Sequence, residues 1–283
     1  MSPVNTPPIQ GTGNSSETVP IWRYMDLAKF VSMLAKSTLW FTKAATFRDD
    51  PYEGFCNATH LDIPSPDDAC IVVEQEGAQG TKTISPEQMM SRLSHISAEI
   101  CERAREHLYV NSWCLASESM AMWEIYGSHG FGLALKSSVG RYRRALSFGV
   151  DDTHYAFEKV TYHHDIASAE EIVRDFSSGS IAVPGAGLRP KIIGLAFHKR
   201  DCYEYETEWR AALYQDLRPD INGIPIECDL EELVSAVYLG PRAEEFFYDA
   251  VASVMDKYHL QKPLEHSAML VAPKNKRAAK DCD

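Results

Sequence analysis

The charged residues between positions 203 and 210 have a spacing that suits acid and base chemistry. Within Tyr203–Arg210, every second position is charged: Glu204, Glu206, Glu208 and Arg210. If this segment is a strand, these side chains share one face, because successive side chains of a strand point to opposite faces. Crowded carboxylates repel one another unless a cation, a proton or a substrate compensates them, and such crowding perturbs pKa values. We therefore expect Glu208 and Glu206 to be catalytic and Arg210 to bind substrate, with a purely structural network around Arg210 as the alternative.

A second group of acids lies in the segment Phe47–Gly54, after an early predicted strand. Asp50 precedes Pro51, which disfavours helical backbone at Asp50 and places Asp50 and Glu53 in a turn at the end of that strand. Turn chemistry alone would explain these acids. The functional interpretation is that Asp50 and Glu53 belong to a substrate-binding site.

The third cluster is Met122–Gly127, on a predicted short helix over residues 119–126. One turn of that helix carries Trp123 and Tyr126, a pattern that also predicts a packing face. Small residues follow Tyr126 and leave room for a ligand beside its ring. Ser117 lies just before the helix, whose N-terminal amides could receive an anion such as phosphate, although a capping role is the ordinary alternative. We expect Ser117, Trp123 and Tyr126 to bind substrate.

Composition limits the classes of function. The 283 residues are 45% hydrophobic and 24% charged, with a formal net charge of −12. Such a charge argues against nucleic acid as a partner, because binding to phosphate backbones depends on clustered Lys and Arg. The seven scattered cysteines show no C-x-x-C spacing and predict neither a disulfide framework nor a zinc site. Without a signal sequence or a long apolar run, the chain is expected to be cytoplasmic and not to bind membranes.

The elements that must position these clusters follow from local patterns. A strand, helix and strand are predicted over residues 21–42, with Asp26 as the helix N-cap and Ser37 as its end. Further strands and helices alternate without an internal repeat or a clean linker. Among them, a helix is predicted over residues 191–199 and a surface loop at His163–Asp165. We predict a disordered segment over residues 1–19, a single α+β domain over 20–273 and a flexible tail over 274–283. Its central sheet is expected to be largely antiparallel or mixed and flanked by helices.

Taken together, the clusters resemble a large bacterial family known as the domain of unknown function 2971. Its pattern is an early R-Y or H-Y strand, F-N-D-P-x-E, M-W-x-x-Y-[AG], E-x-E-[WY]-R and a late strand ending in Gly. The corresponding segments here are Arg23–Tyr24, Phe47–Glu53, Met122–Gly127, Glu206–Arg210 and Val237–Gly240. One departure is Asp49, where the family usually has Asn. The family name implies no activity.

The order of the motifs is also similar to that of ADP-ribosyltransferase folds. Those carry His or Arg on an early strand, an aromatic residue or Ser in a middle motif, and Glu on a late strand, often as E-x-E. The matching positions here are Arg23 or Tyr24, then Ser117 with Tyr126, then Glu206 and Glu208. The resemblance implies NAD as the substrate and cleavage of its nicotinamide glycosidic bond, through an oxocarbenium-like transition state that favours a nearby carboxylate.

This resemblance assigns a role to each matched residue. Glu208 would hold the nicotinamide ribose and stabilise the developing positive charge. Tyr126 would stack on nicotinamide, and Arg23 or Tyr24 would anchor the rest of the dinucleotide. The implied protein is an ADP-ribosyltransferase or NAD glycohydrolase of the toxin or defence type.

Two other functions remain open from the sequence. Asp50, Glu53, Glu206 and Glu208 could form an all-oxygen site for Mg²⁺ or Mn²⁺ and support phosphodiester hydrolysis. Alternatively, the chain could be a non-catalytic module that binds a small ligand, such as a nucleotide, in an aromatic cleft. The sequence identifies no protein partner.

Overall fold

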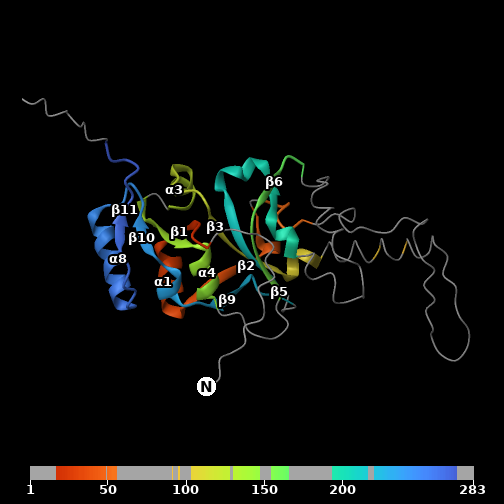
Figure 1. Ribbon diagram of the computed structural model, residues 1–283, viewed down its shortest axis with the longest axis horizontal. Helices are drawn as coiled ribbons and strands as arrows, with labels where there is room; N and C mark the ends of the chain where they lie inside the picture. The colour runs from red at the N-terminus through yellow and green to blue at the C-terminus, as the bar shows by residue number, and fades with distance from the viewer. Residues whose placement is uncertain are drawn as a thin grey trace, which may run out of the picture. The chain divides into compact units, whose positions relative to one another are not determined.

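The computed structural model describes residues 17–48, 50–55, 91, 95, 103–127, 130–146, 154–165, 193–215 and 220–272. The chain divides into two compact units. Figure 1 labels strands and helices of both units. The first unit comprises Thr38–Leu115 and Leu146–Glu227, together with Met1–Ser16, and the second comprises Glu17–Ser37, Ala116–Ala145 and Cys228–Asp283.

The sheet of the first unit is antiparallel throughout, with strand order β9-β2-β3-β8-β5. Its strands are β2 (Thr38–Lys43), β3 (Leu108–Cys114), β5 (His154–Lys159), β8 (Glu208–Tyr214) and β9 (Gly223–Glu227). A second, parallel pair is formed by β6 (Thr161–His163) and β7 (His198–Arg200). Short 3₁₀ helices complete the unit: η1 (Ala44–Thr46), η4 (Leu195–Phe197) and η5 (Asp201–Glu206).

Strand β8 lies between β3 and β5, and it is buried from Glu208 to Leu213. On one face its residue Ala212 packs in a core cluster with Leu108, Val110 and Phe197. Burying large apolar side chains of this kind stabilises a fold by about 1.5–3 kcal/mol each. Because β8 is paired along both edges and buried in this core, the charged side chains at its beginning have fixed positions.

In the second unit, the sheet has the order β11-β10-β4-β1. The pairs β1–β4 and β4–β10 are antiparallel, and β10–β11 is parallel. The strands are β1 (Pro20–Asp26), β4 (Gly132–Ser138), β10 (Ala236–Leu239) and β11 (Leu264–His266). The helices are α1 (Leu27–Lys36), α3 (Met120–Tyr126), α4 (Val139–Ala145), α7 (Leu230–Leu233) and α8 (Glu245–Lys257).

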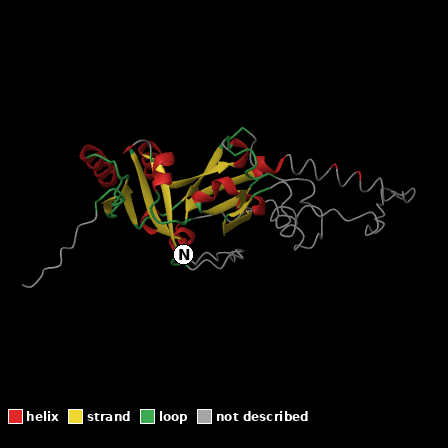
Figure 2. Cartoon of the chain, turned by 90° about the horizontal axis from the view of Figure 1, so that it is seen from above, coloured by secondary structure: helices red, strands yellow, loops and turns green. Residues whose placement is uncertain are grey.

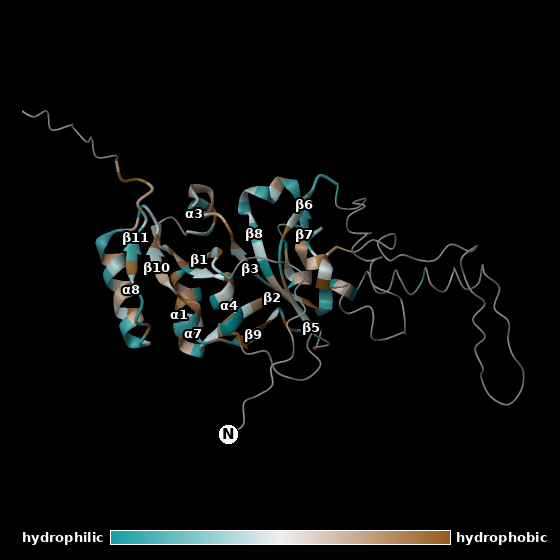
Figure 3. Ribbon diagram, viewed as in Figure 1, coloured by the Kyte–Doolittle hydropathy of each residue, from teal (hydrophilic) through white to brown (hydrophobic). Residues whose placement is uncertain are grey.

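Helix α1 forms where local signals predict it. The Asp26 side chain accepts a hydrogen bond from the Lys29 amide at 2.7 Å, which satisfies a donor at the open end of the helix. At the other end Ser37 adopts a left-handed backbone with φ 50°, and its amide bonds back to the helix. Both predicted boundaries are thus confirmed. In α8 the buried residues Phe247, Val251 and Met255 recur every four positions, so the helix has one apolar face and one polar face (Figure 3).

The predicted α+β class, with largely antiparallel or mixed sheets and flanking helices, is confirmed (Figure 2). The prediction of one domain over residues 20–273 stays a prediction. The predicted tail 274–283 lies outside the described residues, as does the predicted disordered segment 1–19 apart from residues 17–19. In the described ranges, no helix is long and apolar enough to cross a membrane.

Two predicted elements are wrong in detail. The alternating strand expected over residues 203–210 begins only at Glu208, because Asp201–Glu206 form a 3₁₀ helix and Thr207 has a left-handed backbone with φ 41°. The helix expected over residues 191–199 gives way to strand β7 at His198. In both places tertiary packing outweighs the local pattern.

Candidate functional site

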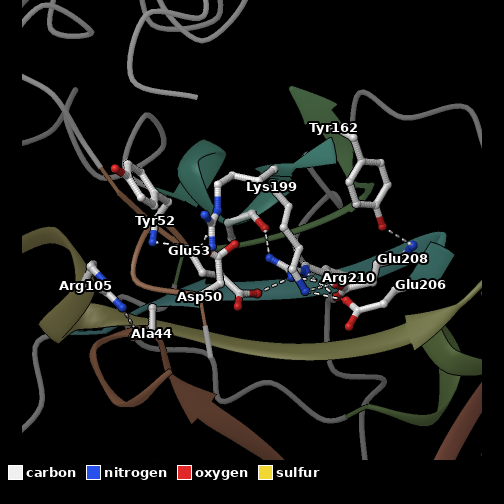
Figure 4. A network of polar contacts seen from close by, with 12 residues as sticks. Ala44, Asp50, Tyr52, Glu53, Arg105, Tyr162, Lys199, Glu206, Glu208 and Arg210 are labelled. Carbon is white, nitrogen blue, oxygen red and sulfur yellow. Dashed lines mark hydrogen bonds and ion pairs between the residues drawn. The ribbon is translucent and has the colours of Figure 1, made fainter. Parts of the chain in front are cut away.

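Glu208 and Arg210, the two charged residues of β8, form an ion pair with two hydrogen bonds. Arg210 Nε lies 2.7 Å from Glu208 Oε2, and Arg210 Nη2 lies 2.8 Å from Glu208 Oε1. Being two positions apart on one strand, the side chains point to the same face. The backbone amide of Glu208 donates to the hydroxyl of Tyr162 on β6 at 2.9 Å. Hydrogen bonds therefore hold Glu208 at both its backbone amide and its carboxylate (Figure 4).

The Glu206 side chain joins the same network from a different secondary-structure element. It ends η5, and the left-handed turn at Thr207 separates it from β8. Lys199, from β7, donates to Glu208 Oε1 at 2.8 Å and also to Glu206 Oε2. Each of these three side chains is less than 8% exposed. Lys199 thus joins the two carboxyl groups in a region from which water is largely excluded.

The turn after η1 brings two further carboxylates to the network. Glu53 accepts from Arg210 Nη2, and Asp50 accepts from Arg200 Nε at 3.1 Å. Asp50 also accepts from the Tyr52 amide at 3.0 Å, which shapes the turn. Arg105 holds the turn from outside by donating to the carbonyl oxygens of Pro51 and Ala44, each at 3.0 Å.

The two catalytic candidates differ in their ease of protonation. Burial raises the pKa of Glu208, but the charge and hydrogen bonds of Arg210, with the charge of Lys199, outweigh burial and hold that pKa well below its usual value. For Glu206, burial and a hydrogen bond with Glu208 raise the pKa to about 7. The charge balance agrees with this raised pKa. Among the described residues, the carboxyl groups of Glu53, Glu206 and Glu208 are in contact with only two cations, Lys199 and Arg210. A proton on Glu206 balances the cluster.

The cations of the network are held in their charged forms. Burial alone would lower the pKa of Lys199, but the charges of Glu208 and Glu53 raise it above its usual value. Arg210 behaves in the same way for the same reason. Proton exchange near neutral pH is therefore a property of Glu206 rather than of its partners.

These contacts bring together five of the residues that the sequence predicts for the site: Asp50, Glu53, Glu206, Glu208 and Arg210. All five lie in the first unit. Asp49, the departure from the resembled motif, lies outside the described residues.

The other five predicted residues lie in the second unit: Arg23, Tyr24, Ser117, Trp123 and Tyr126. Tyr24 packs edge to face on Trp123, with ring centroids 4.8 Å apart. The Tyr24 hydroxyl accepts from the Ser119 amide at 3.1 Å, so this amide before α3 is engaged by the protein. Ser117 is exposed, and Tyr126 is 39% exposed.

Three residues of the first-unit network are not anticipated by the sequence patterns: Tyr162, Lys199 and Arg200. A signal for the two basic residues was present, since His198–Arg200 is a basic run directly before the acidic one. Its assignment to a helix concealed the pairing. The neighbouring His163, expected in a surface loop, is buried and hydrogen-bonds to His198 at 2.8 Å.

No protein-family model matches the chain, and no curated protein matches it. The similarity to the domain of unknown function 2971 therefore remains a resemblance of motifs. Solved structures of DarT from Thermus sp. 2.9 are similar at low identity. The complex with NAD⁺ has 8% identity and a TM-score of 0.36, covering 90% of this chain and 98% of that one.

Two further DarT structures give nearly the same values. The complex with carba-NAD⁺ has 9% identity and a TM-score of 0.35, covering 89% of this chain and 96% of that one. The complex with ADP-ribosylated single-stranded DNA has 10% identity and a TM-score of 0.36, with 89% and 94% covered.

Proposed function

We propose that the chain cleaves the bond between nicotinamide and ribose in NAD and transfers ADP-ribose to an acceptor. The observation that carries this proposal is the pair Glu206 and Glu208, which touch the same Lys199 ammonium but differ in pKa. Cleavage of a glycosidic bond needs one carboxylate that stays ionised beside the sugar and one group that exchanges a proton. The two environments supply those two properties.

Glu208 is the proposed electrostatic residue. Because Arg210 and Lys199 hold its pKa well below the usual value, the carboxylate is ionised near neutral pH. A fixed negative charge in a poorly solvated site stabilises positive charge that develops on the ribose as nicotinamide leaves. Between turnovers, the Lys199 ammonium would compensate the charge of Glu206 and Glu208. During the reaction, the positive charge that develops on the ribose would take over part of this compensation.

Glu206 is the proposed general base. With a pKa raised to about 7 it is partly ionised near neutral pH, which suits a group that must accept a proton there. The acceptor's hydroxyl, amine or water attacks ribose C1 as the bond to nicotinamide breaks. The acceptor's proton passes to Glu206, and nicotinamide leaves as a neutral molecule. With water as the acceptor, the same steps make an NAD glycohydrolase.

For the second-unit residues, the roles implied by the sequence resemblance stay predictions. These are stacking of Tyr126 on nicotinamide, anchoring of the rest of the dinucleotide by Arg23 or Tyr24, and substrate binding by Ser117 and Trp123. Since the reaction consumes NAD, a bacterial toxin or defence role in the cytoplasm is also part of the proposal.

The geometry supports the metal-dependent alternative less well. The four carboxylates proposed as ligands already have cationic partners, with Arg200 on Asp50, Arg210 on Glu53 and Glu208, and Lys199 on Glu206. In the part of the chain that the structure describes, no group of three His, Cys, Asp or Glu side chains is arranged to hold a metal ion. Side-chain cations thus do the charge compensation that Mg²⁺ would do.

The decisive experiment measures nicotinamide released from NAD by the purified chain. Glu206→Gln and Glu208→Gln should each reduce the rate by about 100-fold or more, since one removes a base and the other a charge. Glu204→Gln is the matched control, because Glu204 is exposed on the same segment. The thermal midpoint of each variant shows whether it is folded.

Two results would overturn the proposal. One is no nicotinamide release by the wild-type chain with candidate acceptors or with water, which would favour a binding module. The other is full turnover by a folded Glu206→Gln or Glu208→Gln variant. Strand cleavage of an oligonucleotide that depends on Mg²⁺ would instead support the phosphodiesterase.

A further inference from the structure

Next to the carboxyl network, a guanidinium group and several aromatic rings form a layered surface. The guanidinium carbon of Arg200 lies 4.9 Å from the ring centroid of Tyr52 and 5.5 Å from that of Tyr203. The ring of Tyr205 follows, with its centroid 6.4 Å from that of Tyr203. We call Tyr52, Arg200, Tyr203 and Tyr205 the platform. Its members come from the turn after η1, from β7 and from η5.

The platform is held in place by the buried Asp50. This side chain, only 2% exposed, binds Arg200 through both Nε at 3.1 Å and Nη2 at 3.0 Å. The same carboxylate accepts from the amide of Tyr52. One buried group therefore sets the position of both the guanidinium and the first ring. Such an arrangement is organised before a ligand arrives, which lowers the entropy cost of binding.

Three members of the platform are accessible, and Tyr203 between them is half-buried. Tyr52 is 37% exposed, Tyr205 is 44% exposed and the Arg200 side chain is 31% exposed. Flat aromatic and guanidinium surfaces that are fixed yet exposed are the groups on which nucleic acid bases stack.

The charge around Tyr203 selects the kind of ring that can bind. Besides Arg200, the ammonium group of Lys199 lies 4.5 Å from the Tyr203 ring centroid. Two cations beside one ring repel a positively charged heterocycle and attract a neutral, electron-rich one. The nicotinamide ring of NAD⁺ is a cation, whereas a purine is neutral and has a large π face. The platform therefore favours a purine over nicotinamide.

We infer that the platform binds the neutral purine base of a nucleotide. For its link to NAD chemistry the inference rests on the proposed function, because Lys199 contacts both the Tyr203 ring and the carboxyl pair Glu206 and Glu208. A base on the platform thus lies next to the reacting groups. It is either the adenine of NAD itself or the base of an acceptor nucleotide.

The test is calorimetric titration of the full chain with AMP, and with ribose 5-phosphate to remove the contribution of the base. AMP should bind more tightly than ribose 5-phosphate. Tyr203→Ala and Tyr52→Ala should each weaken AMP binding by about tenfold or more, as loss of a stacking ring does. The matched control is Tyr248→Ala in the second unit, where Tyr248 stacks on His266 at 5.4 Å. It should leave the affinity for AMP unchanged.

Nicotinamide mononucleotide tests the charge argument directly. Its affinity should change less than that of AMP when Tyr203 is replaced. An equal loss for both ligands would overturn the selection of a neutral ring. Absence of AMP binding by the wild-type chain, or unchanged AMP affinity in folded Tyr203→Ala and Tyr52→Ala variants, would overturn the purine site itself.

Competition assigns the source of the base and separates this inference from the proposed function. In the Glu206→Gln variant, displacement of AMP by NAD assigns the platform to adenine of NAD, and AMP binding that persists at saturating NAD assigns it to an acceptor base. Platform-dependent AMP binding without nicotinamide release would leave the purine site standing and remove the proposed function. Nicotinamide release with no loss of AMP affinity in the platform variants would leave the proposed function standing and remove the purine site.

Discussion

Glu208 and Arg210 are joined by two hydrogen bonds, of 2.7 and 2.8 Å, on one face of a buried strand. Arg210 is fully buried and also donates to the Ala196 carbonyl oxygen at 2.6 Å and to Glu53. Removing one partner of a buried pair leaves the other charge without compensation, which costs far more than the pair contributes. Arg210 therefore positions the carboxylates of Glu208 and Glu53 and also contributes to the stability of the fold.

Arg210→Met should therefore lower the free energy of unfolding by about 3–5 kcal/mol at pH 7, because Glu208 and Glu53 lose their guanidinium partner. Urea unfolding followed by circular dichroism measures the change. Arg144→Met is the control, since Arg144 forms exposed pairs with Glu17 and Glu232 that are worth at most about 1 kcal/mol. A loss at Arg210 no larger than that at Arg144 would contradict the buried network.

The raised pKa of Glu206 makes stability depend on pH. An acid whose pKa rises from 4.5 to about 7 on folding binds more protons in the folded state between those two values. Stability from this group should accordingly fall as pH rises from 4.5 to 7, by at most about 1.4 kcal/mol per pH unit. Unfolding of the wild type and of Glu206→Gln across pH 4 to 8 isolates the effect. The difference between the two should change over this window, and a constant difference would show that Glu206 has an ordinary pKa.

The pH dependence of activity should report the same group. If Glu206 is the base, nicotinamide release should rise with pH as its carboxyl group ionises and level off above about pH 7. Lys199→Met removes a charge that lowers the pKa of Glu206, so the rising limb should move to higher pH. Lys36→Met, in the exposed last turn of α1, should leave the limb in place. A limb that does not move in Lys199→Met would separate Lys199 from the titrating group.

Gly54 gives a backbone test of the turn that carries Asp50 and Glu53. Its φ is +69°, and an added Cβ would lie 3.2 Å from both Ala44 Cβ and Leu108 Cδ2. Gly54→Ala should cost about 1–2 kcal/mol from the backbone alone and should also lower activity, because the turn and its carboxylates shift. Unfolding and nicotinamide release are measured together.

Gly194→Ala is the matched control for this substitution. Gly194 has helical backbone, with φ −52°, and an added Cβ there would meet nothing within 4 Å. It should be neutral or stabilising by up to about 1 kcal/mol. Equal effects of the two substitutions would argue against a constrained turn at Gly54.

Features set by neighbouring residues could be predicted from the sequence. Helix α1 begins at Asp26 and ends at Ser37 as expected, because capping bonds and backbone conformation act over a few residues. The shared face of Glu208 and Arg210 also follows from strand alternation alone. Strand alternation fails at Glu206, because a 3₁₀ helix and the left-handed Thr207 lie between Glu206 and β8.

By itself, then, the sequence determined the α+β class, the boundaries of α1 and the choice of Glu206 and Glu208 as the acids of interest. Only the tertiary structure decided their partners. Asp50 and Arg200 are 150 positions apart in the chain, and Glu53 and Arg210 are 157 apart. No local preference encodes such pairs, since they depend on which strands assemble side by side. The different protonation of Glu206 and Glu208 follows from those partners, because burial and neighbouring charge, rather than residue type, decide where each carboxyl group titrates.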